Sequence, residues 1–161
     1  MPVGQIVPIL RQTPERLAAA SAGLSDARLH VPLAPGEWSM AELLAHLRSC
    51  ADVWGDAIEA ISRTDHLVLR AVNPTTWVRS TGYGGIAFAS CLAAFGSQRD
   101  RLLGLLEALP ATGWSRAATV LGAGAPLERS VLSYADRMAR HERAHWRQAV
   151  NTARAVGPPP C

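Results

Sequence analysis

The sequence predicts an all-α protein, a four-helix bundle with an up-down-down-up course, and three observations support this. Four segments carry apolar residues at alternating spacings of three and four, as amphipathic helices do. A long connection, 63–83, separates the second segment from the third and can return the chain to the opposite end of the bundle. An extended piece, 114–121, and a Gly- and Pro-containing turn, 122–126, predict one short β-hairpin before the last helix.

The second segment, 39–62, has the clearest helix start. Ser39 can cap the helix while Glu42 reaches back to the Ser39 amide, which is the capping-box arrangement. Trp38 precedes the cap and can pack on Leu43 as a hydrophobic staple. The second helix is therefore expected to begin at this serine.

The other three helices are defined mainly by periodicity. The first is expected over 6–21, with Pro14 either kinking it or marking its regular start near Thr13. The third is expected over 86–109 and the fourth over 127–154.

Composition narrows the classes of function. The chain has 161 residues, which suits one domain, expected over 1–156, followed by a flexible Pro-rich tail, 157–161. It contains no lysine, so Schiff-base chemistry and a Walker-type phosphate loop are excluded. Three cysteines without a CxxC spacing argue against a disulfide framework or a cysteine-based zinc site.

Charge and hydropathy patterning bear on partners and location. The net charge is +3 and the arginines are scattered, so no nucleic-acid partner is expected. No apolar run is long enough for a membrane span, and the N-terminal residues lack the pattern of a secretory signal. A cytoplasmic protein without a membrane partner is expected.

Two histidines interrupt the apolar stripe of the fourth segment. The stripe passes through Tyr134 and Met138 to His141, His145 and Gln148. Residues four apart share a helical face, so both imidazoles can reach one ion. Burying these polar groups without partners would be costly, and a bound metal removes that cost.

The motif His141-Glu-Arg-Ala-His145 is the HExxH pattern of zinc peptidases. Those enzymes take a third ligand from a downstream Glu or His, and no Asp, Glu or His follows His145 in this chain. The peptidase reading is therefore disfavoured, and the third ligand is expected upstream.

His30 and His66 lie in expected loops, whereas His46 lies on an inward face of the second helix. If the second and fourth helices are antiparallel, His46 and His145 reach the same level.

Other polar residues allow two readings each. Glu142 is a candidate general base, or a partner for a neighbouring arginine; Gln148 can orient a ligand or pack as a polar residue. Arg99, on the seam of the third helix, can bind an anionic group or form a buried pair with Asp52 or Glu142. Cys50, one turn after His46, is a further candidate ligand, although a small core residue is the simpler interpretation. In the connection, Trp77 and Tyr83 can form walls at a pocket mouth.

Taken together, several motifs resemble the DinB / YfiT-like superfamily. They are Pro35-Gly-Glu-Trp-Ser39, Ala45-His46-Leu47, Arg99, and His141-Glu-x-x-His145 followed by Gln148. The resemblance spans nearly the whole chain and implies the up-down-down-up bundle. It also implies a metal site on His46, His141 and His145, and often a homodimer.

The resemblance defines the site better than the reaction. Relatives include thiol S-transferases that use bacillithiol or mycothiol, a mycothiol-dependent isomerase and metal-dependent hydrolases. Three imidazoles leave a coordination position open, which favours catalysis; zinc is expected first, with nickel, iron or manganese as alternatives.

Three functions follow from such a site. The first is a thiol S-transferase, in which the ion binds a low-molecular-weight thiol and the thiolate attacks a small electrophile. The second is a hydrolase, in which the ion activates water. The third is a metal-binding stress protein without turnover.

Overall fold

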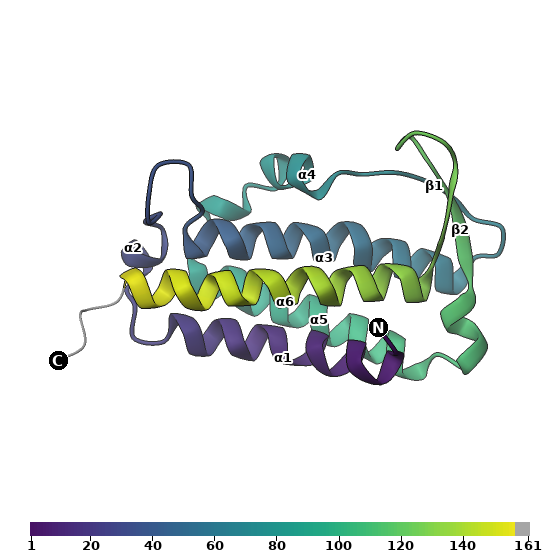
Figure 1. The fold of residues 1–161 in the computed structure, drawn as a ribbon, viewed down its shortest axis with the longest axis horizontal. Helices are drawn as coiled ribbons and strands as arrows, with labels where there is room; N and C mark the ends of the chain where they lie inside the picture. The colour runs from purple at the N-terminus through teal and green to yellow at the C-terminus, as the bar shows by residue number, and fades with distance from the viewer. Residues whose placement is uncertain (157–161) are drawn as a thin grey trace.

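The structure, a computed structural model, describes residues 1–156. Four long helices lie side by side (Figure 1): α1 (Val3–Ser21), α3 (Met40–Arg63), α5 (Phe88–Ala108) and α6 (Val131–Val156). The predicted tail, 157–161, and its Cys161 lie outside the described residues. None of the described helices is long and apolar enough to cross a membrane.

Two clusters of buried side chains fix the direction of each helix. One cluster joins the start of α1 and α6 to the end of α3 and α5, through Ile6, Val131, Ile61 and Leu106. The other joins the opposite ends of the same four helices, through Leu17, Ala149, Leu43 and Phe88. Helices α1 and α6 therefore run one way, and α3 and α5 run the other. The predicted up-down-down-up course is confirmed.

Local sequence signals set the start of α3 as predicted. The Ser39 hydroxyl accepts a hydrogen bond from the Glu42 amide at 3.2 Å, and the Ser39 amide donates to Glu42 Oε2 at 2.8 Å. In α1 the helix runs unbroken from Val3 through both Pro8 and Pro14. The alternative of a regular start near Thr13 is therefore wrong, and fully buried side chains on either side of these prolines hold the helix together.

The last helix begins later than predicted, at Val131 instead of residue 127. Leu127–Ser130 forms strand β3, which pairs antiparallel with β2 (Ala117–Leu121). The predicted hairpin is thus confirmed, and it takes the residues that periodicity alone had given to the helix. Backbone pairing across the hairpin satisfies amide groups that an exposed first helical turn would leave open.

The long connection folds back over α3 and adds a third strand. Strand β1 (Val68–Arg70) pairs parallel with β2, giving the sheet order β1-β2-β3. Helix α4 (Pro74–Thr81) and a 3₁₀ turn, Tyr83–Gly85, then lead into α5. Figure 1 shows α4 lying along α3, with the sheet across one end of the bundle. Two short helical turns, Asp26–Leu29 and Ala111–Ser115, complete the described chain.

A buried ion pair crosses the core between α5 and α6. Arg99 Nη2 contacts Glu142 Oε1, and Arg99 Nη1 donates to Met138 Sδ at 3.1 Å. Arg99 is 2% exposed and Glu142 0% exposed. Burial raises the pKa of Glu142, and the facing Arg99 guanidinium opposes that rise. Each charge is therefore tolerated inside the bundle because the other is present.

Arg99→Met is expected to lower the free energy of unfolding by about 3 kcal/mol, because it leaves a buried carboxyl group without its partner. The double variant Arg99→Met/Glu142→Leu should lose clearly less, since it removes both charges. Urea denaturation of the two variants and the parent checks this. Equal losses in the single and double variants would show that the charge pair has no such coupling.

Candidate metal centre

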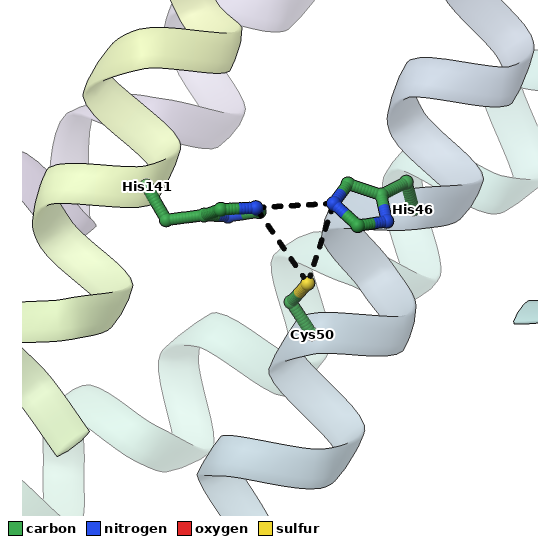
Figure 2. A group of neighbouring side chains, drawn as sticks. All are labelled: His46, Cys50 and His141. Carbon is green, nitrogen blue, oxygen red and sulfur yellow. Dashed lines mark hydrogen bonds between the residues drawn. The ribbon is translucent and has the colours of Figure 1, made fainter. Parts of the chain in front are cut away.

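Two antiparallel helices bring the histidines together. On α3, His46, Cys50 and Trp54 follow one another at intervals of four and share a face. On α6, His141 and His145 occupy the facing side. Figure 2 shows His46 and Cys50 reaching from one helix toward His141 on the other.

The rings of the three histidines lie close together. His141 Nε2 lies 3.0 Å from His46 Nε2 and 3.1 Å from His145 Nε2. Ring centroids are 5.0 Å apart for the His46 pairs with His141 and His145, and 4.4 Å apart for His141 and His145. The structure thus brings the three predicted histidines together, while metal binding by them stays a prediction.

The hydrogen-bond pattern of this cluster fits a cation. His145 Nδ1 lies 3.0 Å from Gln148 Oε1, an acceptor, so Nδ1 carries the proton and Nε2 presents a lone pair to the cluster. If His141 Nε2 carries a proton, that one proton faces two acceptors, the Nε2 atoms of His46 and His145, and can form a good hydrogen bond with only one of them. A metal ion accepting all three lone pairs satisfies them at once. These residues therefore fit the divalent metal that the histidines on one face of the fourth helix predict.

The Cys50 thiol lies next to the histidine cluster. Its Sγ lies 3.6 Å from His46 Nε2 and 4.0 Å from His141 Nε2, and the ligand atoms of these three residues all lie within 4.8 Å of one another. Tetrahedral zinc, with bonds of about 2.0–2.1 Å to nitrogen and about 2.3 Å to sulfur, separates such ligands by about 3.6 Å. The interpretation of Cys50 as only a small core residue is therefore incomplete, because its thiol faces the candidate metal position.

Burial keeps the imidazoles neutral. Desolvation and the nearby His145 lower the pKa of His46 from 6.5 to about 4, and similar causes lower the pKa of His141 to about 3. Burial also lowers the pKa of His145, opposed by its hydrogen bond with Gln148. For the Cys50 thiol, burial and the charge of Glu142 raise the pKa to about 12. Neutral imidazoles are the form that binds a metal.

Two tryptophans enclose the cluster. Trp38 stacks near His145 with ring centroids 5.8 Å apart, and lies 4.8 Å from the His46 ring. Trp54 meets His141 edge-on at 5.0 Å. Sequence reasoning treated Trp38 as a staple and did not single out Trp54. The spacing of four that links His46, Cys50 and Trp54 could have found it.

Of the other candidate residues, Gln148 contacts the histidine cluster, whereas Glu142 and Arg99 contact each other. Gln148 contacts His145 and holds its ring orientation, which is an orienting role. Glu142 and Arg99 pair with each other in the core, which confirms the suggested pairing of Arg99 with Glu142 over Asp52. The roles of Glu142 as a general base and of Arg99 as an anion ligand stay predictions.

The connection between α3 and α5 is attached to the bundle through Asp52 on α3. Trp77 Nε1 donates to Asp52 Oδ2 at 3.1 Å, and the Tyr83 hydroxyl donates to the same oxygen at 3.0 Å. Gln98 Nε2 donates to Asp52 Oδ1. These contacts fasten α4 to the bundle, and Trp77 lines a cavity beside the cluster, as expected for a residue near a pocket mouth.

The metal-free protein is expected to lose stability as the pH falls below 6.5. There the unfolded chain protonates His46 and His141 while the folded protein does not, because both folded pKa values are lowered, to about 4 and about 3. Urea denaturation between pH 7 and pH 5 with a chelator present measures the effect. His46→Asn should flatten this dependence and the exposed control His66→Asn should not; an unchanged slope in His46→Asn would contradict it.

Comparisons with known proteins identify the family of this chain. The sequence profile of the DinB superfamily matches residues 9–149. A search of curated proteins finds no match. Among solved structures, the chain is similar to YfiT from Bacillus subtilis, described as a probable metal-dependent hydrolase with an unusual four-helix bundle topology. The TM-score is 0.79 at 15% identity, covering 94% of this chain and 85% of that one, so the likeness concerns the fold. With the family profile matching most of its length, the chain belongs to the DinB superfamily.

Proposed function

We propose that the protein binds one divalent metal ion through His46, His141 and His145, and transfers a thiol to small electrophiles. The observation that carries the proposal is the approach of His141 Nε2 to within 3.0 Å of His46 Nε2, on the facing helix, and 3.1 Å of His145 Nε2. Zinc is the metal we expect first, although imidazole ligands also suit nickel, iron and manganese.

Three imidazole ligands leave room for a further ligand, which is the pattern of catalytic sites. When bound, the ion would lower the pKa of a coordinated thiol or water and so supply a nucleophile at neutral pH. In the reaction proposed, the thiol gives its proton to solvent and the sulfur forms a carbon–sulfur bond. The leaving group departs with its bonding electron pair.

The residues around the cluster favour a thiol over water as the nucleophile. The only carboxylate of the HExxH motif, Glu142, is fully buried with its Oε1 against Arg99, so it is poorly placed to serve as a base. A thiol, with a pKa of about 8.5, ionises far more readily than water and has less need of a general base. Gln148 holds His145 in the tautomer that keeps its Nε2 lone pair on the cluster.

Two other functions are each supported by one observation. Metal-dependent hydrolysis is supported by the description of the similar protein YfiT as a probable metal-dependent hydrolase. A metal-binding protein without turnover is supported by Cys50, whose Sγ, 3.6 Å from His46 Nε2, is placed to close the site as a fourth ligand.

Purified protein is expected to bind about one zinc ion per chain, and His145→Asn should weaken zinc binding by more than about 100-fold, because a ligand is lost. Competition with a chromophoric chelator measures the affinity. The matched control is His66→Asn, at an exposed residue whose positive φ of 53° asparagine also tolerates. Equal zinc affinity in His145→Asn and the parent would refute the three-histidine site.

Cobalt substitution is expected to distinguish an open site from a closed one. In the open site, the near-ultraviolet sulfur-to-cobalt band should appear only after a thiol cosubstrate is added, and should appear equally in Cys50→Ser. A strong band without added thiol that disappears in Cys50→Ser would instead establish Cys50 as the fourth ligand and favour the reading without turnover.

Turnover assays then separate transferase from hydrolase. Zinc-loaded protein is expected to consume a model aryl halide only when one member of a panel of low-molecular-weight thiols is present, and His145→Asn should be inactive. Hydrolysis of a model ester at the same rate without any thiol, coupled with no reaction of the aryl halide, would replace the proposed transferase by a hydrolase.

A further inference from the structure

A large cavity lies beside the candidate metal centre. It has a volume of about 1140 Å³ and is bounded by α3, the connection from Leu69 to Trp77, the β2–β3 turn and the first half of α6. Figure 1 shows the connection and the sheet arching over the side of the bundle formed by α3 and α6. A volume of this size accommodates a small organic molecule.

Trp54 links the cavity to the histidine cluster. Its side chain lines the cavity and also meets the His141 ring edge-on, with centroids 5.0 Å apart. Arg137, which lines the cavity too, lies one turn before His141 on α6, about 6 Å along the axis. A molecule bound in the cavity is therefore within a few ångströms of the side chains that surround the candidate metal position.

Three arginines of the cavity lining have no carboxylate partner. Arg70 comes from β1, Arg129 from β3 and Arg137 from α6, so three separate segments supply them. Within residues 1–156, none of the three forms a salt bridge. The Arg137 guanidinium lies over the Trp54 ring, 5.0 Å from its centroid, and keeps its hydrogen-bond donors available.

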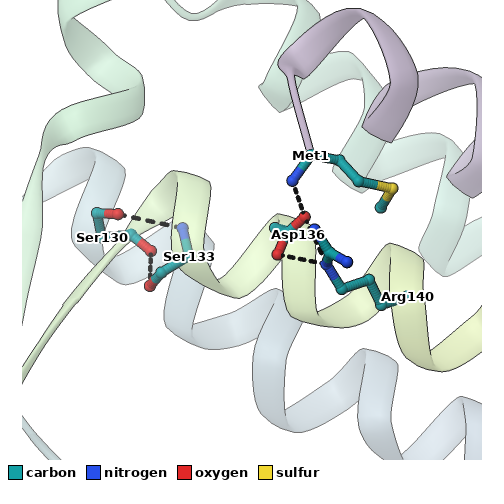
Figure 3. Close-up of polar contacts among 5 residues, drawn as sticks. All are labelled: Met1, Ser130, Ser133, Asp136 and Arg140. Atoms are coloured by element: carbon teal, nitrogen blue, oxygen red, sulfur yellow. Dashed lines mark hydrogen bonds and ion pairs between the residues drawn. The ribbon is translucent and has the colours of Figure 1, made fainter.

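The acidic residues of the lining are largely engaged elsewhere. Asp136 pairs with Arg140 at 2.9 Å and with the amino group of Met1 (Figure 3). Asp52 accepts hydrogen bonds from three side chains of α4, the 3₁₀ turn and α5. These donors are neutral, so Asp52 keeps its charge, and the three arginines without an ion pair face two carboxylates, Asp52 and Asp56. The excess of free positive charge favours an anion.

Much of the remaining lining is apolar. Besides Trp54, it includes Leu69, Val120 and Leu127 from the sheet and its approaches, and Ala57 from α3. Leu127 is 40% exposed and lies opposite Val120 in the hairpin, so both side chains add apolar surface to the lining. An apolar wall beside unpaired guanidinium groups is complementary to a molecule with an apolar body and one anionic end.

We propose that this cavity binds a small organic carboxylate with an apolar body, held at its charged end by Arg137 and Arg129 and along its body by Trp54. The binding itself needs no metal. That the bound carboxylate is the electrophilic substrate of the neighbouring centre rests on the proposed function.

Calorimetric titration of chelator-treated protein with octanoate and octanamide, which differ only in the charged end, tests the proposal. Octanoate is expected to bind about tenfold more tightly than octanamide, since only the carboxylate forms charge-assisted hydrogen bonds. Arg137→Gln should remove most of that preference and leave octanamide binding unchanged. Arg154→Gln, the same change on an exposed residue of α6 outside the cavity, should have no effect.

Equal affinities for octanoate and octanamide, or no saturable binding of octanoate, would overturn the proposal. So would an Arg137→Gln variant that retains the full preference and also the thermal stability of the parent. Zinc affinity measured on the same preparations distinguishes failure of the metal-centre proposal from failure of the carboxylate-cavity proposal. Loss of zinc binding with intact octanoate binding counts against the metal centre alone, and the converse result counts against the carboxylate cavity alone.

Discussion

The antiparallel contact between α3 and α6 is the constraint on which the centre depends. Imidazoles are short, so rings from two helices meet only where the helices are adjacent and their residues lie at the same level. His46 is near the start of α3, and His141 and His145 are in the second half of α6. The two core clusters at opposite ends of the bundle hold this alignment, because a shift of one turn would displace both sets of packed side chains at once.

Polar groups inside the bundle are tolerated through two different kinds of partnership. Arg99 and Glu142 neutralise each other, and the pair engages the glutamate of the HExxH motif inside the core. The histidines cannot satisfy one another fully with protons, and their lowered pKa values keep them neutral with lone pairs facing inward. One helix, α6, thus carries a structural ion pair and a candidate metal centre on adjacent residues whose side chains point to different sides.

The connection between α3 and α5 does more than return the chain to the other end of the bundle. Its strand joins the hairpin and its helix α4 is fastened to Asp52, so a cavity forms over α3 and α6 where a bare bundle would have an open groove. Because Trp54 belongs to both the cavity and the surroundings of His141, the cavity and the histidine cluster share a wall. Binding energy gained in such a cavity can orient a substrate toward the reacting position.

Much of the fold could be predicted from sequence because its signals are local. The capping box at Ser39, the spacing of apolar residues and the length of the connection determined the four helices and their course. The spacing of His141 and His145, together with the inward face of His46, determined which histidines to expect in one place.

Only the tertiary structure decided the rest. Whether Leu127–Ser130 is helix or strand depends on pairing with β2, and β1 depends on a partner far away in sequence. The direction of Glu142 toward Arg99, the approach of Cys50 to the histidines and the gathering of unpaired arginines around one cavity are set by packing between distant segments, which no local pattern encodes.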